Sequence, residues 1–186
     1  MVSIRPSEPE DRARIYNILM GSQIFGKVDA DCVDEMFEQA MAKPGPDQYR
    51  FLSAWEGDQM LAFGCYGMTS LTKATWDYYW LCALPEARGK GAGSALMRHG
   101  IAQATREGGR LMVLYTSSDL RYAFAQRIFD ELGFSLHTII PEYYDVGDDL
   151  KIYVGRLSES YLPSEHDAGR DRRPIVAPGV LQWQKR

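Results

Sequence analysis

The apolar positions of this chain change their spacing several times, and each change predicts a new helix or strand. Intervals of three and four residues, as at Ile15, Ile18 and Leu19, are typical of an amphipathic helix, whereas short apolar runs predict buried strands. The predicted helices cover residues 7–19, 30–42, 92–104 and 120–132. The predicted strands cover residues 2–5, 49–56, 60–69, 76–84, 111–116, 134–140 and 150–157. This mixture indicates an α/β (α+β) fold built on a central sheet.

A basic, glycine-rich turn follows the strand that ends at Leu84. Gly89, Gly91 and Gly93 lack side chains where backbone amides must turn inward, and the unpaired N–H groups of the next helix start can then face an anion. The flanking Arg88 and Lys90 add positive charge at the same place. We therefore predict that this turn binds phosphate.

Three other interpretations of the turn are weaker. A Walker motif needs Ser or Thr directly after its Lys, but Gly91 follows Lys90. The third glycine of a dinucleotide fingerprint would fall at position 94, which is Ser94. A turn that only connects strand and helix is the remaining alternative.

The spacing of Arg88, Gly91 and Gly93 resembles the acetyl-CoA signature of the GNAT superfamily of N-acetyltransferases. Residues 84–86 look like the family's entry into this turn, and residues 128–134 look like its closing helix and following strand. The resemblance implies a GNAT-like mixed, largely antiparallel sheet with a splayed pair of parallel strands and helices on both faces. It also implies acetyl transfer from acetyl-CoA to a primary amine by direct attack in a ternary complex.

The resemblance further implies which residues hold the cofactor. Backbone groups of Leu81, Cys82 and Ala83 would pair with the pantetheine arm and polarise the thioester carbonyl. The turn and helix start would hold the pyrophosphate, through Arg88, Gly89, Lys90, Gly91, Ala92, Gly93 and Ser94.

The catalytic side chains follow from the same resemblance. An alkylammonium has a pKa of about 10.4 and must lose a proton before it attacks. Asp77 stands where relatives often carry Glu, so we predict it as the general base, acting directly or through water; a solvent-exposed edge carboxylate is the alternative. The helix positions that hold Asn and Tyr in many relatives are here Tyr122 and Phe129. Phe129 cannot donate a proton, so CoA leaves as a thiolate or takes its proton from Tyr122 or water, unless Tyr122 only packs.

The acceptor would lie between residues 20–29 and 141–149. Acidic and aromatic residues in the second segment, such as Tyr144 and Asp148, predict a cationic amine: a small metabolite, a peptide N-terminus or a lysine. Two alternatives stay open. One is a noncatalytic acyl-CoA binder or sensor, which the presence of Phe129 favours, and the other is a transferase for a longer acyl-CoA.

Composition narrows the function classes. The chain has 186 residues, 45% of them hydrophobic, and a formal net charge of −4, which argues against nucleic acid as the main partner. A mean hydropathy of −0.32 and the lack of a long apolar run or a signal-peptide core predict a cytoplasmic protein without membrane contact. The histidines His99, His137 and His166 are scattered, so we predict no metal.

The cysteines and the C-terminal residues complete the prediction. Cys32, Cys65 and Cys82 stand in apolar surroundings and are expected to be reduced and to fill the core. Composition becomes polar from Ser158 onward, so we expect one domain over residues 1–157 and an extension over 158–186. The extension would dock on its own domain or on a second subunit, in keeping with a homodimer.

Overall fold

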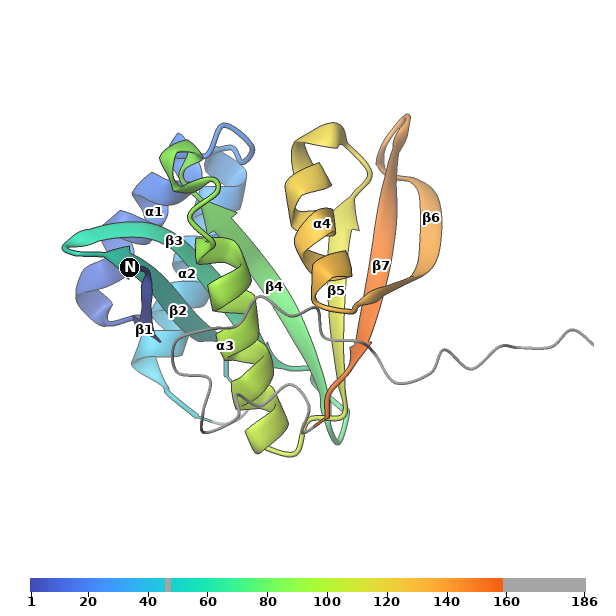
Figure 1. Ribbon diagram of the computed structural model, residues 1–186, viewed down its shortest axis with the longest axis horizontal. Coiled ribbons are helices and arrows are strands. Elements are labelled where there is room, and N and C mark those ends of the chain that lie inside the picture. The colour runs from blue at the N-terminus through green and yellow to red at the C-terminus, as the bar shows by residue number, and fades with distance from the viewer. Residues whose placement is uncertain (46–47, 159–186) are drawn as a thin grey trace, which may run out of the picture.

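A computed structural model describes residues 1–45 and 48–158, and in these ranges seven strands form one sheet (Figure 1). The strands are β1 (Ser3–Pro6), β2 (Arg50–Glu56), β3 (Gln59–Met68), β4 (Thr75–Ala83), β5 (Leu111–Ser117), β6 (Ser135–Asp145) and β7 (Asp148–Arg156). The helices are α1 (Arg12–Gly21), α2 (Lys27–Ala42), α3 (Ala92–Arg106) and α4 (Ala123–Glu131), with short 3-10 turns η1 (Pro9–Asp11), η2 (Pro85–Ala87) and η3 (Leu120–Tyr122). The strand order is β1-β2-β3-β4-β5-β7-β6.

Strands β4 and β5 run parallel, whereas the other neighbours in the sheet are antiparallel. Their pairing ends where Tyr78 lies opposite Leu114, although β4 continues to Ala83. In the ladder with β3, Cys65 pairs with Trp80 but the next residue pairs with Tyr78, so β4 contains a bulge at the intervening position. This confirms the predicted mixed, largely antiparallel sheet with a splayed parallel pair.

Apolar side chains fill both faces of the sheet. Helices α3 and α4 cover the face seen in front in Figure 1, and α1 and α2 lie behind strands β2 to β4. Leu96, Ile101 and Leu114 belong to the front cluster, whereas Val33 and Phe37 belong to the cluster behind. Because successive residues of a strand point to opposite faces, strands β2, β3 and β4 contribute to both clusters.

The observed elements differ from the predicted ones at several ends. Helix α2 begins at Lys27 instead of Ala30, because the Asp29 carboxylate accepts a hydrogen bond from the Gly26 N–H at 2.8 Å and satisfies the helix start. Strand β6 continues through Pro141 to Asp145, past the predicted end at residue 140. Pro141 is tolerated since β6 is an edge strand, where a missing N–H costs no ladder bond. The last helix starts with the 3-10 turn η3.

The cysteine prediction is wrong for one residue. Cys32 is exposed on α2, whereas Cys65 and Cys82 are buried, and all three are free thiols. Nearly all of the predicted extension, residues 159–186, lies outside the described residues. In the described ranges, no helix is long and apolar enough to cross a membrane.

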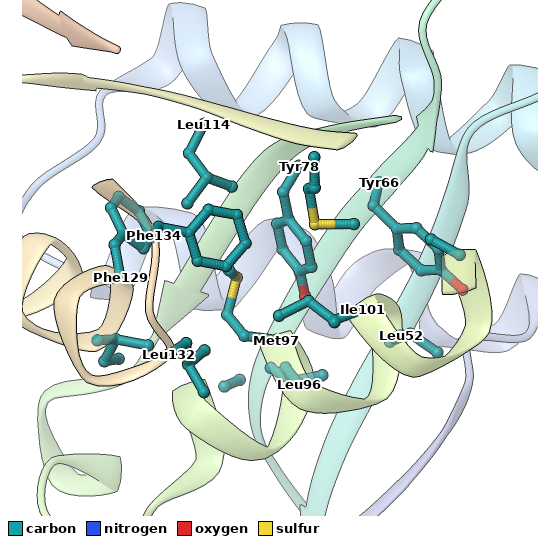
Figure 2. Packing of buried hydrophobic residues seen from close by; sticks show 14 of the residues in the cluster. Leu52, Tyr66, Tyr78, Leu96, Met97, Ile101, Leu114, Phe129, Leu132 and Phe134 are labelled. Atoms are coloured by element: carbon teal, nitrogen blue, oxygen red, sulfur yellow. The ribbon is translucent and has the colours of Figure 1, made fainter. Parts of the chain in front are cut away.

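Tyr78 fills a space that two glycines leave open beneath α3. Figure 2 shows its ring pointing from the sheet toward that helix. A Cβ atom at Gly64 would lie 2.1 Å from the Tyr78 hydroxyl oxygen, and one at Gly100 would lie 2.9 Å from its ring. The hydroxyl is buried and has no hydrogen-bond partner among the described residues. The close approach of β3, β4 and α3 therefore depends on having glycine, which has no side chain, at positions 64 and 100.

We expect Gly64→Ala to lower the free energy of unfolding by about 1–3 kcal/mol, because its methyl group overlaps the Tyr78 hydroxyl. Tyr78→Phe removes a buried, unpartnered hydroxyl and should leave stability unchanged or raise it. In the double variant the nearest ring atom would be 3.0 Å away, so part of the loss should be recovered. Urea unfolding measures the stability of the two single variants and the double variant. If Gly64→Ala were as stable as the wild type, the packing described here would be wrong.

Candidate functional site

A cavity of about 390 Å³ lies beside the diverging end of β4. Its walls come from β4, the turn after it, the start of α3, η3, α4 and the loop before α2. Nine of its residues are those predicted for the cofactor, namely Leu81, Cys82, Ala83, Arg88, Gly89, Gly91, Ala92, Gly93 and Ser94. The rest of the lining contains Tyr122, which was predicted as a catalytic residue, and residues that the sequence patterns did not assign to the site, which are Ile24, Phe25, Ala87, Leu120, Arg121, Phe124, Ala125 and Ile128.

The start of α3 presents unpaired backbone N–H groups at this cavity. Gly91 is the N-cap with a φ of 77°, a left-handed conformation that glycine adopts without strain. The first hydrogen bond of the helix runs from Ala95 N to Gly91 O at 2.9 Å. The N–H groups of Ala92, Gly93 and Ser94 precede it and have no partner within the helix. Together with the helix dipole they form an anion-binding end.

The two cations of the turn are placed differently. Arg88 is exposed and lines the cavity, as predicted. Lys90 is absent from the lining, and its Nζ instead lies 2.6 Å from the Glu56 carboxylate at the end of β2. Arg121 lines the cavity from η3, where its guanidinium lies 3.0 Å from Asp119. An arginine therefore stands on each of two separate walls.

Aromatic rings form the side of the cavity nearest the loop before α2. The Phe25 ring lies edge-on to Trp80, with centroids 5.4 Å apart, and to Tyr122, with centroids 6.0 Å apart. Tyr122 is half-buried, and burial raises the pKa of its hydroxyl. The charge of Arg121 acts to lower this pKa, and those of Asp29 and Asp148 act to raise it. At neutral pH Tyr122 is therefore a protonated phenol that can donate a hydrogen bond.

Phe129, which replaces the tyrosine of many relatives, lies in the core. It is 6% exposed and packs edge-on against Tyr153, with ring centroids 5.4 Å apart. It is absent from the cavity lining. Its position thus supplies neither a proton donor nor a ring to the cavity.

Asp77 lies in the paired part of β4, opposite Val113, and is absent from the cavity lining. It is 6% exposed, so the alternative of a solvent-exposed edge carboxylate is wrong. Its Oδ2 accepts hydrogen bonds from Thr69 Oγ1 at 2.8 Å and from the Tyr79 hydroxyl at 3.3 Å. Oδ1 is buried without a partner among the described residues. Burial raises the pKa of this carboxyl, although both donated hydrogen bonds act to lower it.

In the described ranges, no three His, Cys, Asp or Glu side chains come together as candidate metal ligands. The polar groups that line the cavity are backbone amides, the guanidinium groups of Arg88 and Arg121, the hydroxyls of Ser94 and Tyr122, and the Cys82 thiol.

A sequence profile of the acetyltransferase (GNAT) family matches residues 12–134, which is more than half of the chain. The chain belongs to this family. The match runs from the start of α1 past α4 and so contains β4, the glycine turn and most of the cavity wall. GNAT enzymes are acyltransferases that use acetyl-CoA.

Solved GNAT structures share this fold. A protein from Desulfovibrio desulfuricans assigned to the GNAT acetyltransferases is 29% identical, with a TM-score of 0.80, over 85% of this chain and 100% of its own. The ribosomal-protein-S18-alanine N-acetyltransferase from Escherichia coli is 21% identical, with a TM-score of 0.69, over 89% and 98%. A Salmonella typhimurium protein assigned as an acetyltransferase and solved with its cofactor acetyl-CoA is 22% identical, with a TM-score of 0.69, over 88% and 98%. Among curated proteins there is no match.

The unequal placement of the two cations predicts unequal effects on CoA affinity. We expect Arg88→Ala to weaken CoA binding about tenfold, since a charge-assisted hydrogen bond contributes about 1.5 kcal/mol. Lys90→Ala should weaken it less than about threefold, because Glu56 already pairs with Lys90 at the surface.

Isothermal titration with CoA measures both variants, and Glu56→Gln, which leaves Lys90 free to turn to the cavity, is the matched control. Equal losses in Arg88→Ala and Lys90→Ala would show that the Lys90–Glu56 pair does not persist when CoA binds.

Proposed function

We propose that this chain transfers an acetyl group from acetyl-CoA to a primary amine by direct attack in a ternary complex. The observation that carries the proposal is the cavity where β4 leaves β5, closed at one end by the unpaired amides of α3. A thioester is already activated, so the protein must align the reactants, stabilise the developing oxyanion and manage two protons.

The donor side of the site is assigned to the cavity. The diphosphate of CoA would meet the amides of residues 92–94 and Arg88, where a helix N-terminus and a full cation act together. The pantetheine arm would run along Leu81–Ala83, whose backbone on the β5 side lost its partner when the strands diverged. The cavity matches CoA in chemistry as well as in shape. Groups that bind an anion lie at one end, and the unpaired backbone edge of β4 lies along its length.

The acceptor side carries negative charge and aromatic rings. Asp148 accepts hydrogen bonds from Ser117 Oγ and from Ser118 N, which holds the last hairpin against the end of β5. Asp29, in the first turn of α2, and Asp148, at the start of β7, both raise the pKa of the Tyr122 hydroxyl, against the opposing charge of Arg121. Carboxylates beside aromatic rings favour a cationic amine. A small metabolite, a peptide N-terminus and a lysine side chain all satisfy this chemistry.

The proposal assigns the two proton transfers to Asp77 and Tyr122. Asp77 would receive the proton of the acceptor ammonium, and Tyr122 would protonate the departing CoA thiolate. The buried position of Phe129 is the observation that favours the competing function, a noncatalytic acyl-CoA binder, because the donor found in many relatives is missing.

Thiol release from acetyl-CoA, measured across a panel of primary amines, tests the function. We expect amine-dependent release that is faster with cationic acceptors than with acidic ones. Saturable CoA binding without release from any amine would establish the binder instead, and a parallel titration with succinyl-CoA would reveal a longer donor. The absence of saturable CoA binding would overturn the whole assignment.

Tyr122→Phe tests the proposed proton donor. We expect kcat to fall at least about tenfold, because general acid catalysis of this kind contributes a factor of about 100 or more, while CoA affinity stays near the wild-type value. The substituted phenylalanine keeps the ring contact with Phe25, so a fall in kcat would report the loss of the hydroxyl and not a loss of packing. An unchanged kcat would remove Tyr122 from the mechanism.

A further inference from the structure

The burial of Asp77 prevents direct contact between its carboxylate and an amine in the acceptor site. The residue is 6% exposed, and its unpartnered Oδ1 is fully enclosed. The other oxygen, Oδ2, is occupied by Thr69 and Tyr79. Of these two donors, the Tyr79 side chain reaches the surface, with 36% of its area exposed. Thr69 is only partly exposed, so Tyr79 is the more exposed of the two groups that donate a hydrogen bond to this carboxylate.

We propose that Tyr79 is a catalytic residue that relays the acceptor's proton to Asp77, an inference that rests on the proposed acetyl transfer. The ammonium N–H proton passes to the Tyr79 hydroxyl oxygen as the Tyr79 hydroxyl proton passes to Oδ2 of Asp77. The nitrogen keeps the electron pair of the broken N–H bond and can attack the thioester carbonyl. One ammonium and one carboxylate thus become a neutral amine and a neutral carboxylic acid, and the phenol is regenerated within the step.

The bulge in β4 places Tyr79 where this relay is needed. Tyr79 is the extra residue of the bulge and comes directly after the last position that pairs with β5. It is two residues, about 7 Å along a strand, from Leu81 in the cavity wall. An extended arm that enters along residues 81–83 therefore ends beside Tyr79.

The side chain of Tyr79 points away from the cavity face. Tyr78 packs beneath α3, whereas the Tyr79 ring lies edge-on to Tyr49 on the opposite face, with centroids 5.2 Å apart. Because the cavity is bounded by α3 and α4, a donor in it and an amine at Tyr79 would approach from opposite faces of the sheet. Direct attack requires the amine nitrogen to reach the thioester carbon, and the end of β4–β5 pairing at Tyr78 leaves the place where the two would meet.

The surroundings of the pair keep Tyr79 neutral and Asp77 available as the final proton acceptor. Burial and the charge of Asp77 raise the pKa of the Tyr79 hydroxyl, so a free tyrosinate is disfavoured and concerted transfer avoids it. The groups that act on the pair are Thr69 beside Asp77, Tyr49 and Cys65 beside Tyr79, and Tyr115 on β5. No lysine, arginine or histidine of the described residues contributes to the pKa of Asp77. A cationic acceptor therefore meets no fixed positive charge at the carboxylate.

Two amine probes of different basicity test the relay. n-Butylamine is protonated at neutral pH and needs the relay, whereas trifluoroethylamine is already neutral and depends on it less. We expect Tyr79→Phe to lower kcat/KM for n-butylamine about 100-fold, in line with general base catalysis, and to lower that for trifluoroethylamine much less. Asp77→Asn should show the same selectivity, and the double variant should be no slower than either single variant.

Tyr49→Phe is the matched control, since it removes a neighbouring hydroxyl, keeps the ring contact and should retain wild-type rates. The relay would be overturned if Tyr79→Phe lowered kcat/KM equally for both amines, or if the effects of Tyr79→Phe and Asp77→Asn were additive. Either result would leave the proposed acetyl transfer intact. A wild-type chain that releases thiol with neither these probes nor any amine of the panel would overturn the transfer itself, and the relay with it.

Discussion

The loss of hydrogen bonding between β4 and β5 after Tyr78 is the constraint on which the rest of the structure depends. Backbone groups that leave a ladder must find another partner, and a strand in the middle of a sheet has no solvent-facing edge to supply one. The bulge in β4 bends the strand at this point. The open edge borders a cavity that an extended ligand with its own amide groups can fill.

The same strand separates two chemical environments. Residues that point forward from β4, such as Tyr78, meet α3, and the cavity with its anion-binding amides lies on that side. Residues that point backward, such as Asp77 and Tyr79, share a hydrogen-bonded cluster with Thr69. Strand alternation alone would send Tyr79 and Trp80 to opposite faces, but the bulge lets both serve the rear face.

Sequence patterns were sufficient for the features that depend on local chemistry. The glycine turn, the helix that it starts and the succession of helices and strands along the chain follow from backbone requirements and apolar spacing. Nine of the ten cofactor residues that the family resemblance implies line one cavity. The exception, Lys90, pairs with Glu56, which is distant in sequence and becomes its neighbour only through the β2–β3 hairpin. Phe25 and Arg121 were missed for the same reason, since tertiary contacts alone bring their segments to the cavity. The apolar run Tyr78–Cys82 concealed the bulge, and with it the position of Tyr79.

The attachment of the last hairpin to β5 has a mechanical consequence. Asp148 holds both Ser117 and Ser118, and Asp149 N–H bonds to the Ser118 hydroxyl at 2.8 Å, so hairpin and strand end move as one body. The opposite wall at Phe25 rests on ring contacts, which resist displacement far less than a set of hydrogen bonds to a carboxylate does. A bulky substrate in the cavity would therefore displace the aromatic wall at Phe25 before it displaced the hairpin. Substitutions around Phe25 should thus change substrate selectivity without weakening the sheet.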